Sequence, residues 1–430
     1  MAKRGLFTYF TPPMSPPPDA PQMTRAQWII VLLIGAVQFV NILDFVIVMP
    51  LGPDFAKALG VPESNLGYVG GAYTGAACVS GLVGSLFLDR FDRRKALAVA
   101  MLGLVIGTAA GGLAVDLPTL LLARIVAGSF GGPATSIAFS IIADAIPSAL
   151  RGRAMGTVMG AFSIASVFGV PAGLLLAEHF SWRAPFIGVA LVGVFVAAAA
   201  IFALPPMTGH LARANEKVDV GQLLANPLVQ LSYLMTAVVM MAGFVIIPNI
   251  AAYLQLNLGL PREALKYAYG AGGIASLLAT QLGGRAVDRF GSFRVGTVGA
   301  TMVIGVVFGF FYLPHHDVAV WLVMLVFVGF MISNGLRNVS YNTLTTKVPP
   351  PAVRARFQSL QSATQHGASA LAAILSAQLL TTVEPSPGLK RLAGMDHVAL
   401  VSIGLSLVIP VLLYVVERGV KQQAMAARPG

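Results

Sequence analysis

Apolar residues along the chain fall into long runs that are separated by short polar stretches. A helix needs about 20 residues to cross the core of a bilayer, and twelve runs are long enough to do so. They lie near 28–56, 65–87, 94–114, 118–146, 153–178, 182–204, 227–256, 263–286, 293–313, 318–346, 355–380 and 396–417. The pattern therefore predicts an all-α membrane protein with twelve transmembrane helices in two six-helix bundles.

Polar segments set the remaining boundaries. Residues 1–26 are rich in proline and contain no apolar run, so we expect a disordered tail and no cleavable signal peptide. The first bundle is expected over 27–204 and the second over 226–417, joined by a polar linker at 205–225. A short tail, 418–430, completes the chain.

Composition and charge agree with a membrane location. Hydrophobic residues make up 56% of the 430 residues and charged residues only 10%, against about 25% in soluble domains. The net charge of +11 does not indicate nucleic-acid binding, because the basic residues lie between apolar runs. With a cytoplasmic N-terminus, 20 Lys and Arg residues fall on the cytoplasmic side and 6 on the other. This bias predicts cytoplasmic termini, and the alanine and glycine content suggests a bacterial inner membrane.

One short motif occurs twice, 199 residues apart. Asp89-Arg90-Phe91 follows the second run of the first bundle, and Asp288-Arg289-Phe290 follows the second run of the other. The same motif at the same topological position indicates two parallel repeats. Carriers that rock two bundles about a central site are built in this way.

These loops resemble the signature loop of the major facilitator superfamily, and the resemblance covers residues 27–417. The second copy keeps both glycines of that loop, whereas the first has Ser85 and Asp92 where glycines are usual. Aspartate tolerates a left-handed backbone better than most residues, so we expect the same turn there. The resemblance implies a cytoplasmic gate, with Asp144 as the partner of a loop arginine. The residues expected in this gate are Asp89, Arg90, Arg93, Arg94, Asp144, Asp288 and Arg289.

A second resemblance concerns the fifth run. Gly169-Val170-Pro171-Ala172-Gly173 resembles the pattern of the drug/proton and sugar-efflux antiporters of this family, although the usual Gly-Pro pair is missing. It implies a hinge that includes Gly160, Gly169, Pro171 and Gly173.

Two charged residues lie deep in the first bundle. Asp44 and Arg124 each lie about seven residues from the outer end of their run, which is roughly 10 Å of helix. An ion pair between them is therefore geometrically allowed. It could be a fixed structural pair, or a switch in which protonation of Asp44 releases Arg124. The family resemblance favours the switch, because related antiporters use such a pair.

The second bundle carries a buried cation, Arg337, with no acidic residue at its depth. Asn334, Asn338, Tyr341 and Asn342 recur around it at helical spacing and form a polar stripe, which should face a water-filled cavity. The residues expected to line that cavity are Gln38, Asn41, Tyr73, Asn249, Tyr253, Asn334, Arg337, Asn338, Tyr341, Gln361, Gln365 and His366. The charge balance argues for an anionic, zwitterionic or neutral amphipathic substrate.

The leading hypothesis is thus a monomeric, proton-coupled exporter of small amphipathic molecules that needs no cofactor beyond the proton gradient. A carrier of lipid-like cargo such as a lysolipid, and an importer of an anionic solute, remain open on the same scaffold. A channel or receptor is the non-carrier alternative. The chain has no phosphate-binding Gly-x-x-x-x-Gly-Lys-Ser/Thr loop. The six histidines are too scattered for a metal site or an intramembrane enzyme.

Overall fold

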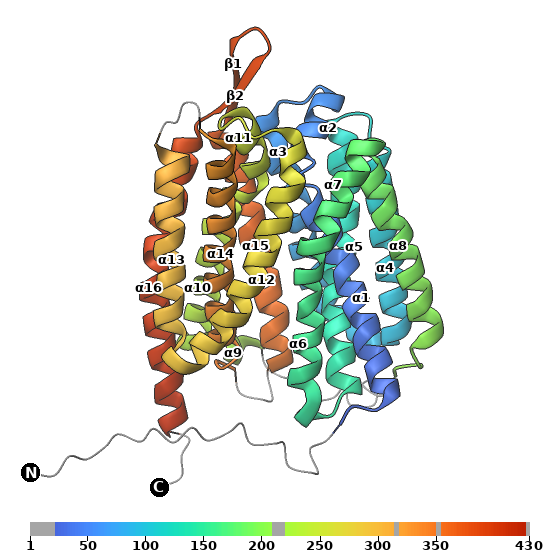
Figure 1. Ribbon diagram of the computed structural model, residues 1–430. Coiled ribbons are helices and arrows are strands. Elements are labelled where there is room, and N and C mark those ends of the chain that lie inside the picture. Colours follow the sequence, from blue (N-terminus) through green and yellow to red (C-terminus); the bar gives the residue numbers. More distant parts are fainter. Residues whose placement is uncertain (1–21, 209–219, 314–317, 350–353, 427–430) are drawn as a thin grey trace, which may run out of the picture.

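The computed structural model describes residues 22–208, 220–313, 318–349 and 354–426. Most of the expected N-terminal tail, the middle of the linker and the last four residues lie outside these ranges. The described chain is a bundle of long helices, with first-half helices on the right of Figure 1 and second-half helices on the left. Helix α1 begins and helix α16 ends at one end of the bundle, which we call the termini end. We call the opposite end the hairpin end, because it carries the hairpin of β1 and β2.

The first half contains six spanning elements within the described residues, three of which are accompanied or interrupted by shorter segments. Their bounds are α1 (Arg25–Ile47), α2 (Gly52–Leu59), η1 (Glu63–Asn65), α3 (Leu66–Phe87), η2 (Leu88–Arg90), α4 (Arg93–Gly112), α5 (Leu117–Ala145), α6 (Ser148–Ile164), η3 (Ala165–Gly169), α7 (Val170–His179) and α8 (Ala184–Ala203). The expected first span thus divides into α1 and α2. The fifth consists of α6 and α7, joined by the π-helical turn η3.

The second half repeats this order. Its elements are α9 (Val220–Ala225), α10 (Pro227–Phe244), η5 (Ile247–Asn249), α11 (Ile250–Leu256), η6 (Arg262–Ala264), α12 (Leu265–Phe290), α13 (Ser292–Val307), η7 (Phe308–Tyr312), α14 (Val320–Thr345), α15 (Arg354–Leu379), β1 (Thr381–Ser386), β2 (Leu389–Ala393) and α16 (Met395–Ala426). The antiparallel hairpin turns at Gly388, whose φ of 80° favours glycine.

Side chains that cap the helices explain several of these bounds. Thr24 accepts a hydrogen bond from the backbone of Gln27, and the Gln27 side chain accepts one from the backbone of Thr24, so α1 begins with a capping box. Asp116 and Thr119 cap α5 in the same way. Hydrogen bonds from Thr119 hold the pKa of the exposed Asp116 carboxyl below its usual value.

Ten helical segments in the described ranges are long and apolar enough to cross a membrane. The two expected spans that miss this threshold are α12 and α15, which are rich in glycine, alanine and polar residues. Both lie between the halves, since α15 packs against α3 and α12 packs against η3 and α7. Helices that face a partner bundle need less apolar surface than helices that face lipid.

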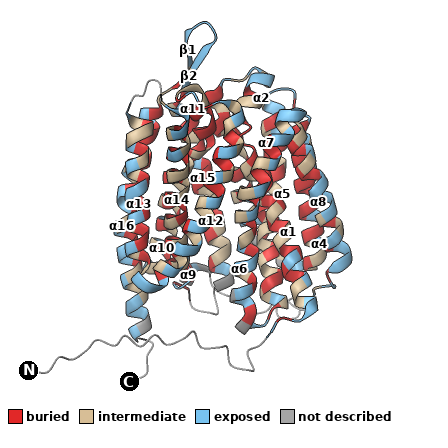
Figure 2. Cartoon of the chain, viewed as in Figure 1, coloured by how far each residue is buried: buried red, intermediate tan, exposed pale blue. Residues whose placement is uncertain are grey.

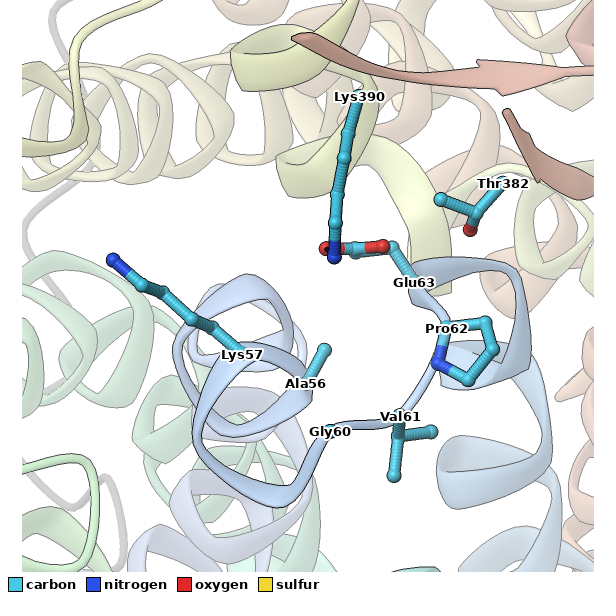
Figure 3. Close-up of a pocket in the computed structure, with 8 residues that line it drawn as sticks. All are labelled: Ala56, Lys57, Gly60, Val61, Pro62, Glu63, Thr382 and Lys390. Atoms are coloured by element: carbon cyan, nitrogen blue, oxygen red, sulfur yellow. Dashed lines mark hydrogen bonds and ion pairs between the residues drawn. The ribbon is translucent and has the colours of Figure 1, made fainter. Parts of the chain in front are cut away.

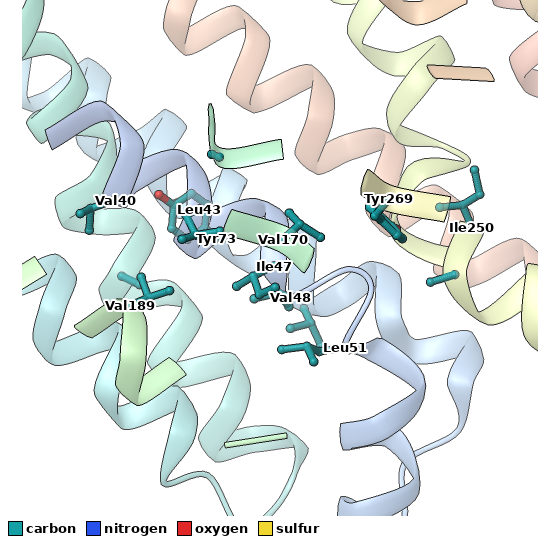
Figure 4. Close-up of a cluster of buried hydrophobic side chains, with 14 of the residues drawn as sticks. Val40, Leu43, Ile47, Val48, Leu51, Tyr73, Val170, Val189, Ile250 and Tyr269 are labelled. Carbon is teal, nitrogen blue, oxygen red and sulfur yellow. The ribbon is translucent and has the colours of Figure 1, made fainter. Parts of the chain in front are cut away.

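The outer faces of the helices are exposed (Figure 2), and many of the side chains on them are large and apolar. Phe195 and Phe202 on α8, for example, are 73% and 86% exposed. Exposed apolar surface on this scale is expected where the solvent is lipid. The interior is apolar as well. Figure 4 shows part of one buried cluster, which includes Ile47 and Val170 of the first half and Ile250 and Tyr269 of the second.

Candidate functional site

Asp44 and Arg124 form a buried, two-point ion pair between α1 and α5. Arg124 Nη1 donates to Asp44 Oδ1 and Nη2 donates to Oδ2, both at 2.9 Å. The side chains are 0% and 1% exposed. Charged groups at such depth need a partner or a function. The ion pair that the positions of Asp44 and Arg124 in the sequence allow is therefore present in the structure.

Thr108 of α4 completes the pair and was not expected from the sequence. Its hydroxyl lies 2.7 Å from Asp44 Oδ1 and 2.8 Å from the Leu104 carbonyl oxygen. The single hydroxyl hydrogen therefore serves two acceptors. If Asp44 takes up a proton, Thr108 can accept from the new carboxyl O–H while still donating to Leu104. The site can thus satisfy hydrogen bonding in both protonation states of Asp44.

Small residues bring the three helices close enough for this contact. A side chain at Gly128 of α5 would clash with the backbone carbonyl of Tyr73 on α3. One at Gly107 of α4 would clash with the backbone of Ala127 on α5. Glycine at these positions lets the backbones of α3, α4 and α5 touch, so that Thr108 of α4 and Arg124 of α5 both reach Asp44 Oδ1.

Two of the expected cavity residues in the first half form a network one turn from Asp44. Asn41 donates to the Gly131 carbonyl at 2.8 Å and to Thr135 at 2.6 Å, while its Oδ1 accepts from the Tyr73 hydroxyl at 2.5 Å. Gln38 is buried next to this network, and its Oε1 has no hydrogen-bond partner within the described chain.

A row of aromatic rings leads from this site to the second half. The Arg124 guanidinium lies 4.7 Å from the centre of the Tyr73 ring. Tyr73 stacks on Phe45 with ring centres 5.3 Å apart, and Phe45 stacks on Phe244 of α10 at 5.8 Å. The residue that follows Asp44 in the sequence is therefore in direct contact with the other bundle.

Part of the polar stripe of α14 is buried, between α10 and α15. Arg337 and Tyr341 are buried, with Arg337 only 1% exposed. Arg337 Nη2 donates to Asn334 Oδ1 at 2.6 Å. Across to α15, Gln365 donates to the Tyr341 hydroxyl at 2.9 Å. Gln361 of α15 donates to the Thr345 hydroxyl at 2.9 Å, one turn further along α14.

The remaining expected cavity residues have mixed surroundings. His366 and Asn338 are half-buried on α15 and α14. Asn249 donates to Ser376 at 2.9 Å, and its Oδ1 lacks a partner among the described residues. Tyr253 instead stabilises the packing of α11 on η7, since its hydroxyl donates to the Phe310 carbonyl and its ring stacks on Phe311.

At the termini end, Asp144 pairs with one arginine of the first loop. Arg93 Nε lies 2.7 Å from Asp144 Oδ2. Arg94 reaches the Leu204 carbonyl at 3.4 Å. Arg90 is exposed, and the Asp89 side chain lies outside the described atoms. In the second half, Asp288 and Arg289 are exposed, and Arg289 lies over the Phe290 ring.

The expected left-handed turn at Asp92 is wrong. Gly291 of the second copy does have a positive φ of 89°, but Asp92 has a φ of −56°. The Asp92 carboxylate instead caps α4, accepting from the Arg94 backbone at 2.8 Å and from the Met207 backbone at 3.3 Å. A side chain that caps the next helix replaces the glycine turn, so the two loops differ in backbone path.

The antiporter-like segment packs directly on the helix that carries Asp44. A side chain at Gly169 would lie 2.7 Å from Leu43, and one at Gly173 would clash with Ile47. Pro171 lies near Gly270 of α12, whereas the space around Gly160 is open. The π-helical turn η3 ends at Gly169, and such turns often mark functional positions in helices.

Among the described residues, three ion pairs join the two halves at the hairpin end. Asp54 pairs with Arg262 at 2.5 Å, Glu178 with Lys266 at 2.6 Å, and Glu63 with Lys390 at 3.1 Å. Each acid belongs to the first half and each base to the second. These contacts close the halves against each other at this end.

A small cavity of about 290 Å³ lies beside the last of these pairs. Figure 3 shows Lys390 reaching from the hairpin to Glu63, with Lys57 on the other side. Thr382 of the hairpin accepts a hydrogen bond from the backbone of Ser64 at 3.1 Å. The hairpin therefore holds the two halves together in addition to extending from the bundle.

Comparison with known families agrees with this architecture. A model of the Major Facilitator Superfamily matches residues 34–373. The chain belongs to the Major Facilitator Superfamily. This membership places it among multi-pass membrane carriers. The fold is similar to that of a D-xylose–proton symporter, with a TM-score of 0.72 at 16% identity over 90% of this chain and 97% of that structure.

Curated relatives of this superfamily member include proteins named for efflux and resistance. A chloramphenicol resistance protein of Streptomyces lividans is 26% identical over 59% of this chain and 66% of its own length. A probable sugar efflux transporter of Pasteurella multocida is 25% identical over 61% of this chain and 66% of its own length. The matched stretch thus spans slightly less than two-thirds of these relatives.

Proposed function

We propose that this carrier is a proton-coupled exporter, an antiporter that exchanges small amphipathic molecules for protons by rocking its two halves. The observation that supports it most is the fully buried pair of Asp44 and Arg124, with Thr108 beside it. A purely structural ion pair needs no neighbour that can accept a hydrogen bond from a protonated carboxyl. A proton switch does need one, and Thr108 can fill that role. The proton gradient is the energy source, and one chain without a cofactor is the working unit.

The proposed cycle links protonation to the gates. The cycle starts from a state in which the hairpin end is closed and Asp44 is ionised against Arg124. We take the termini end as the cytoplasmic side, because Lys and Arg predominate there. Protonation of Asp44 removes its charge and weakens its hold on Arg124. Since Phe45 follows Asp44 and stacks on Phe244, a shift of α1 is transmitted to the second half.

The mechanism also predicts which gradient drives transport. Purified protein in liposomes with an acidic interior should accumulate cargo, because protons leave as cargo enters. The panel includes chloramphenicol, a simple sugar, and neutral, cationic and anionic aromatic compounds. The uptake should stop when nigericin collapses the pH gradient, and protein-free liposomes measure passive trapping.

A different outcome would replace the proposal. Accumulation only with an acidic exterior indicates proton symport, that is, import. Flux that follows the cargo gradient and ignores the pH gradient indicates uncoupled transport. Flux without saturation or counterflow indicates a channel.

A further inference from the structure

Arg337 is a buried cation whose guanidinium is largely unused. Its Nη2 donates to Asn334 Oδ1 at 2.6 Å. Nε and Nη1 have no partner within the described chain, although the residue is 1% exposed. The contrast with Arg124 is direct, because Arg124 has a carboxylate that engages both of its terminal nitrogens.

A buried positive charge without a counter-charge is unfavourable, because burial removes its hydration. Helix packing does not account for it. A side chain at Gly299 of α13 would lie 2.8 Å from the Arg337 backbone nitrogen, so it is the backbone that packs on α13. A Leu or Met at position 337 would keep that backbone contact without burying a charge. The guanidinium therefore needs a role that apolar residues cannot fill.

The groups around Arg337 keep its free donors available. On the α10 side stands Gly243, where an added Cβ would lie 3.0 Å from Nη2. Within the described chain, the Asn338 side chain has an unpaired Oδ1. Gln361 of α15, which bonds to Thr345 about two turns further along α14, has an unpaired Oε1. The Gln365 and Tyr341 side chains bind each other. These residues offer the guanidinium no carboxylate, and two of them present unpaired acceptors to donors of a bound molecule.

A guanidinium has a planar set of N–H donors that matches the oxygens of a carboxylate, sulfonate or phosphate. The net charge of the buried residues also favours an anionic ligand. Asp44 and Arg124 neutralise each other, which leaves Arg337 as the uncompensated charge of the three. An organic cation would meet repulsion at this site, whereas an oxyanion would supply the missing counter-charge.

The location suits a carrier that couples cargo to protons. Gly243 precedes Phe244, and Phe244 stacks on Phe45, which follows Asp44. The free guanidinium in the second half is thus connected to the proposed proton site in the first half through two stacked rings. An anion bound to Arg337 would lie on the second-half side of the Phe45–Phe244 stack, and the proton on Asp44 would lie on the first-half side.

We propose that Arg337 binds one oxyanion group of the cargo, so that the preferred substrates are amphipathic organic anions or zwitterions. This proposal names the cargo class of the exporter proposed above and rests on that function. Arg337 is the positively charged anchor. Asn338 and Gln361 accept hydrogen bonds from hydroxyl or N–H groups of the same molecule.

The test compares matched aromatic probes that differ in charge: naphthaleneacetate, naphthalenesulfonate, naphthyl phosphate and the neutral naphthaleneacetamide. Binding to the detergent-purified full chain is measured without a pH gradient. Wild type should bind one or more of the anions roughly tenfold more tightly than the amide, because charge-assisted hydrogen bonds are stronger than neutral ones. The anion preferred identifies which oxyanion the site takes.

Arg337→Gln should remove this preference and leave amide binding nearly unchanged. Arg337→Lys should restore part of it, because lysine keeps the charge but not the planar donors. Arg285→Gln, which changes an exposed arginine on α12, is the matched control. The ratio of anion to amide binding is taken within each variant, so a general loss of folded protein does not imitate the result.

Equal binding of anions and amide by wild type, or equal losses of both in Arg337→Gln, would overturn the proposal and leave Arg337 hydrated by water alone. The experiment separates the two proposals. If anion preference persists in Asp44→Asn but no pH gradient drives transport, the anion site stands and proton coupling fails. If gradient-driven transport occurs without anion preference, the reverse holds.

Discussion

Arg124→Ala is expected to lower the free energy of unfolding by about 3–5 kcal/mol and to abolish transport, because it leaves a buried carboxylate without its counter-charge. The effect is large because Asp44 is 0% exposed and both of its oxygens are bonded to this guanidinium. Denaturant unfolding in detergent, followed by circular dichroism, gives the free energy. Counterflow in proteoliposomes gives the transport rate.

The double variant Asp44→Asn/Arg124→Gln is the matched comparison. It removes both charges and keeps polar groups of similar size, so it should be more stable than Arg124→Ala although it carries one more change. Arg153→Ala, on the exposed end of α6, controls for loss of an arginine elsewhere. A loss below about 1 kcal/mol in Arg124→Ala, the scale of exposed pairs, would show that this pair contributes little to the fold.

The second large effect is expected from Gly67→Leu at the contact between α3 and α15. A Cβ at Gly67 would clash with the Ala373 carbonyl of the other half. Overpacking of this kind costs about 1–3 kcal/mol, and here the cost applies only when the hairpin end is closed. The equilibrium between the two conformations should therefore shift roughly tenfold or more towards opening at this end, and transport should slow accordingly.

A cysteine introduced at Ser64 reports on this opening. Ser64 is buried at the interface, where its backbone binds Thr382 of the hairpin. With Cys78 changed to Ser, a membrane-impermeant maleimide should label Ser64→Cys faster when Gly67→Leu is also present. Gly81→Leu, on the same helix but in open space, should leave the labelling rate unchanged. Equal labelling in all three proteins would show that this contact does not control the closed state.

The number of spans, the two-fold repeat and the Asp44–Arg124 pair follow from the sequence because they depend on regular properties. Long apolar runs indicate helices that cross a membrane. Because a helix rises by a constant distance per residue, the position of a residue within its run gives its depth in the membrane. The same estimate of depth shows that no acidic residue of the second bundle lies at the depth of Arg337. None of these inferences needs the orientation of a side chain.

Features that depend on orientation or on contacts between distant loops could not be predicted. Thr108 is one of several small residues in α4, and only the packing of the helices shows that it faces Asp44. The pair of Asp54 and Arg262 joins residues 208 positions apart. The prediction of a left-handed turn at Asp92 was wrong because the aspartate side chain caps α4 instead, which needs no left-handed backbone.

Asp44→Asn tests the central claim, that this buried carboxylate couples cargo to protons, most directly. The same proteoliposomes are assayed for counterflow, which needs no net proton movement, and for accumulation driven by an acidic interior. Asp116→Asn, at the exposed N-cap of α5, is the control for loss of a carboxylate elsewhere. The account predicts that Asp44→Asn keeps counterflow but loses accumulation to the level of protein-free liposomes, whereas Asp116→Asn keeps both. Accumulation by Asp44→Asn equal to that of wild type would contradict it.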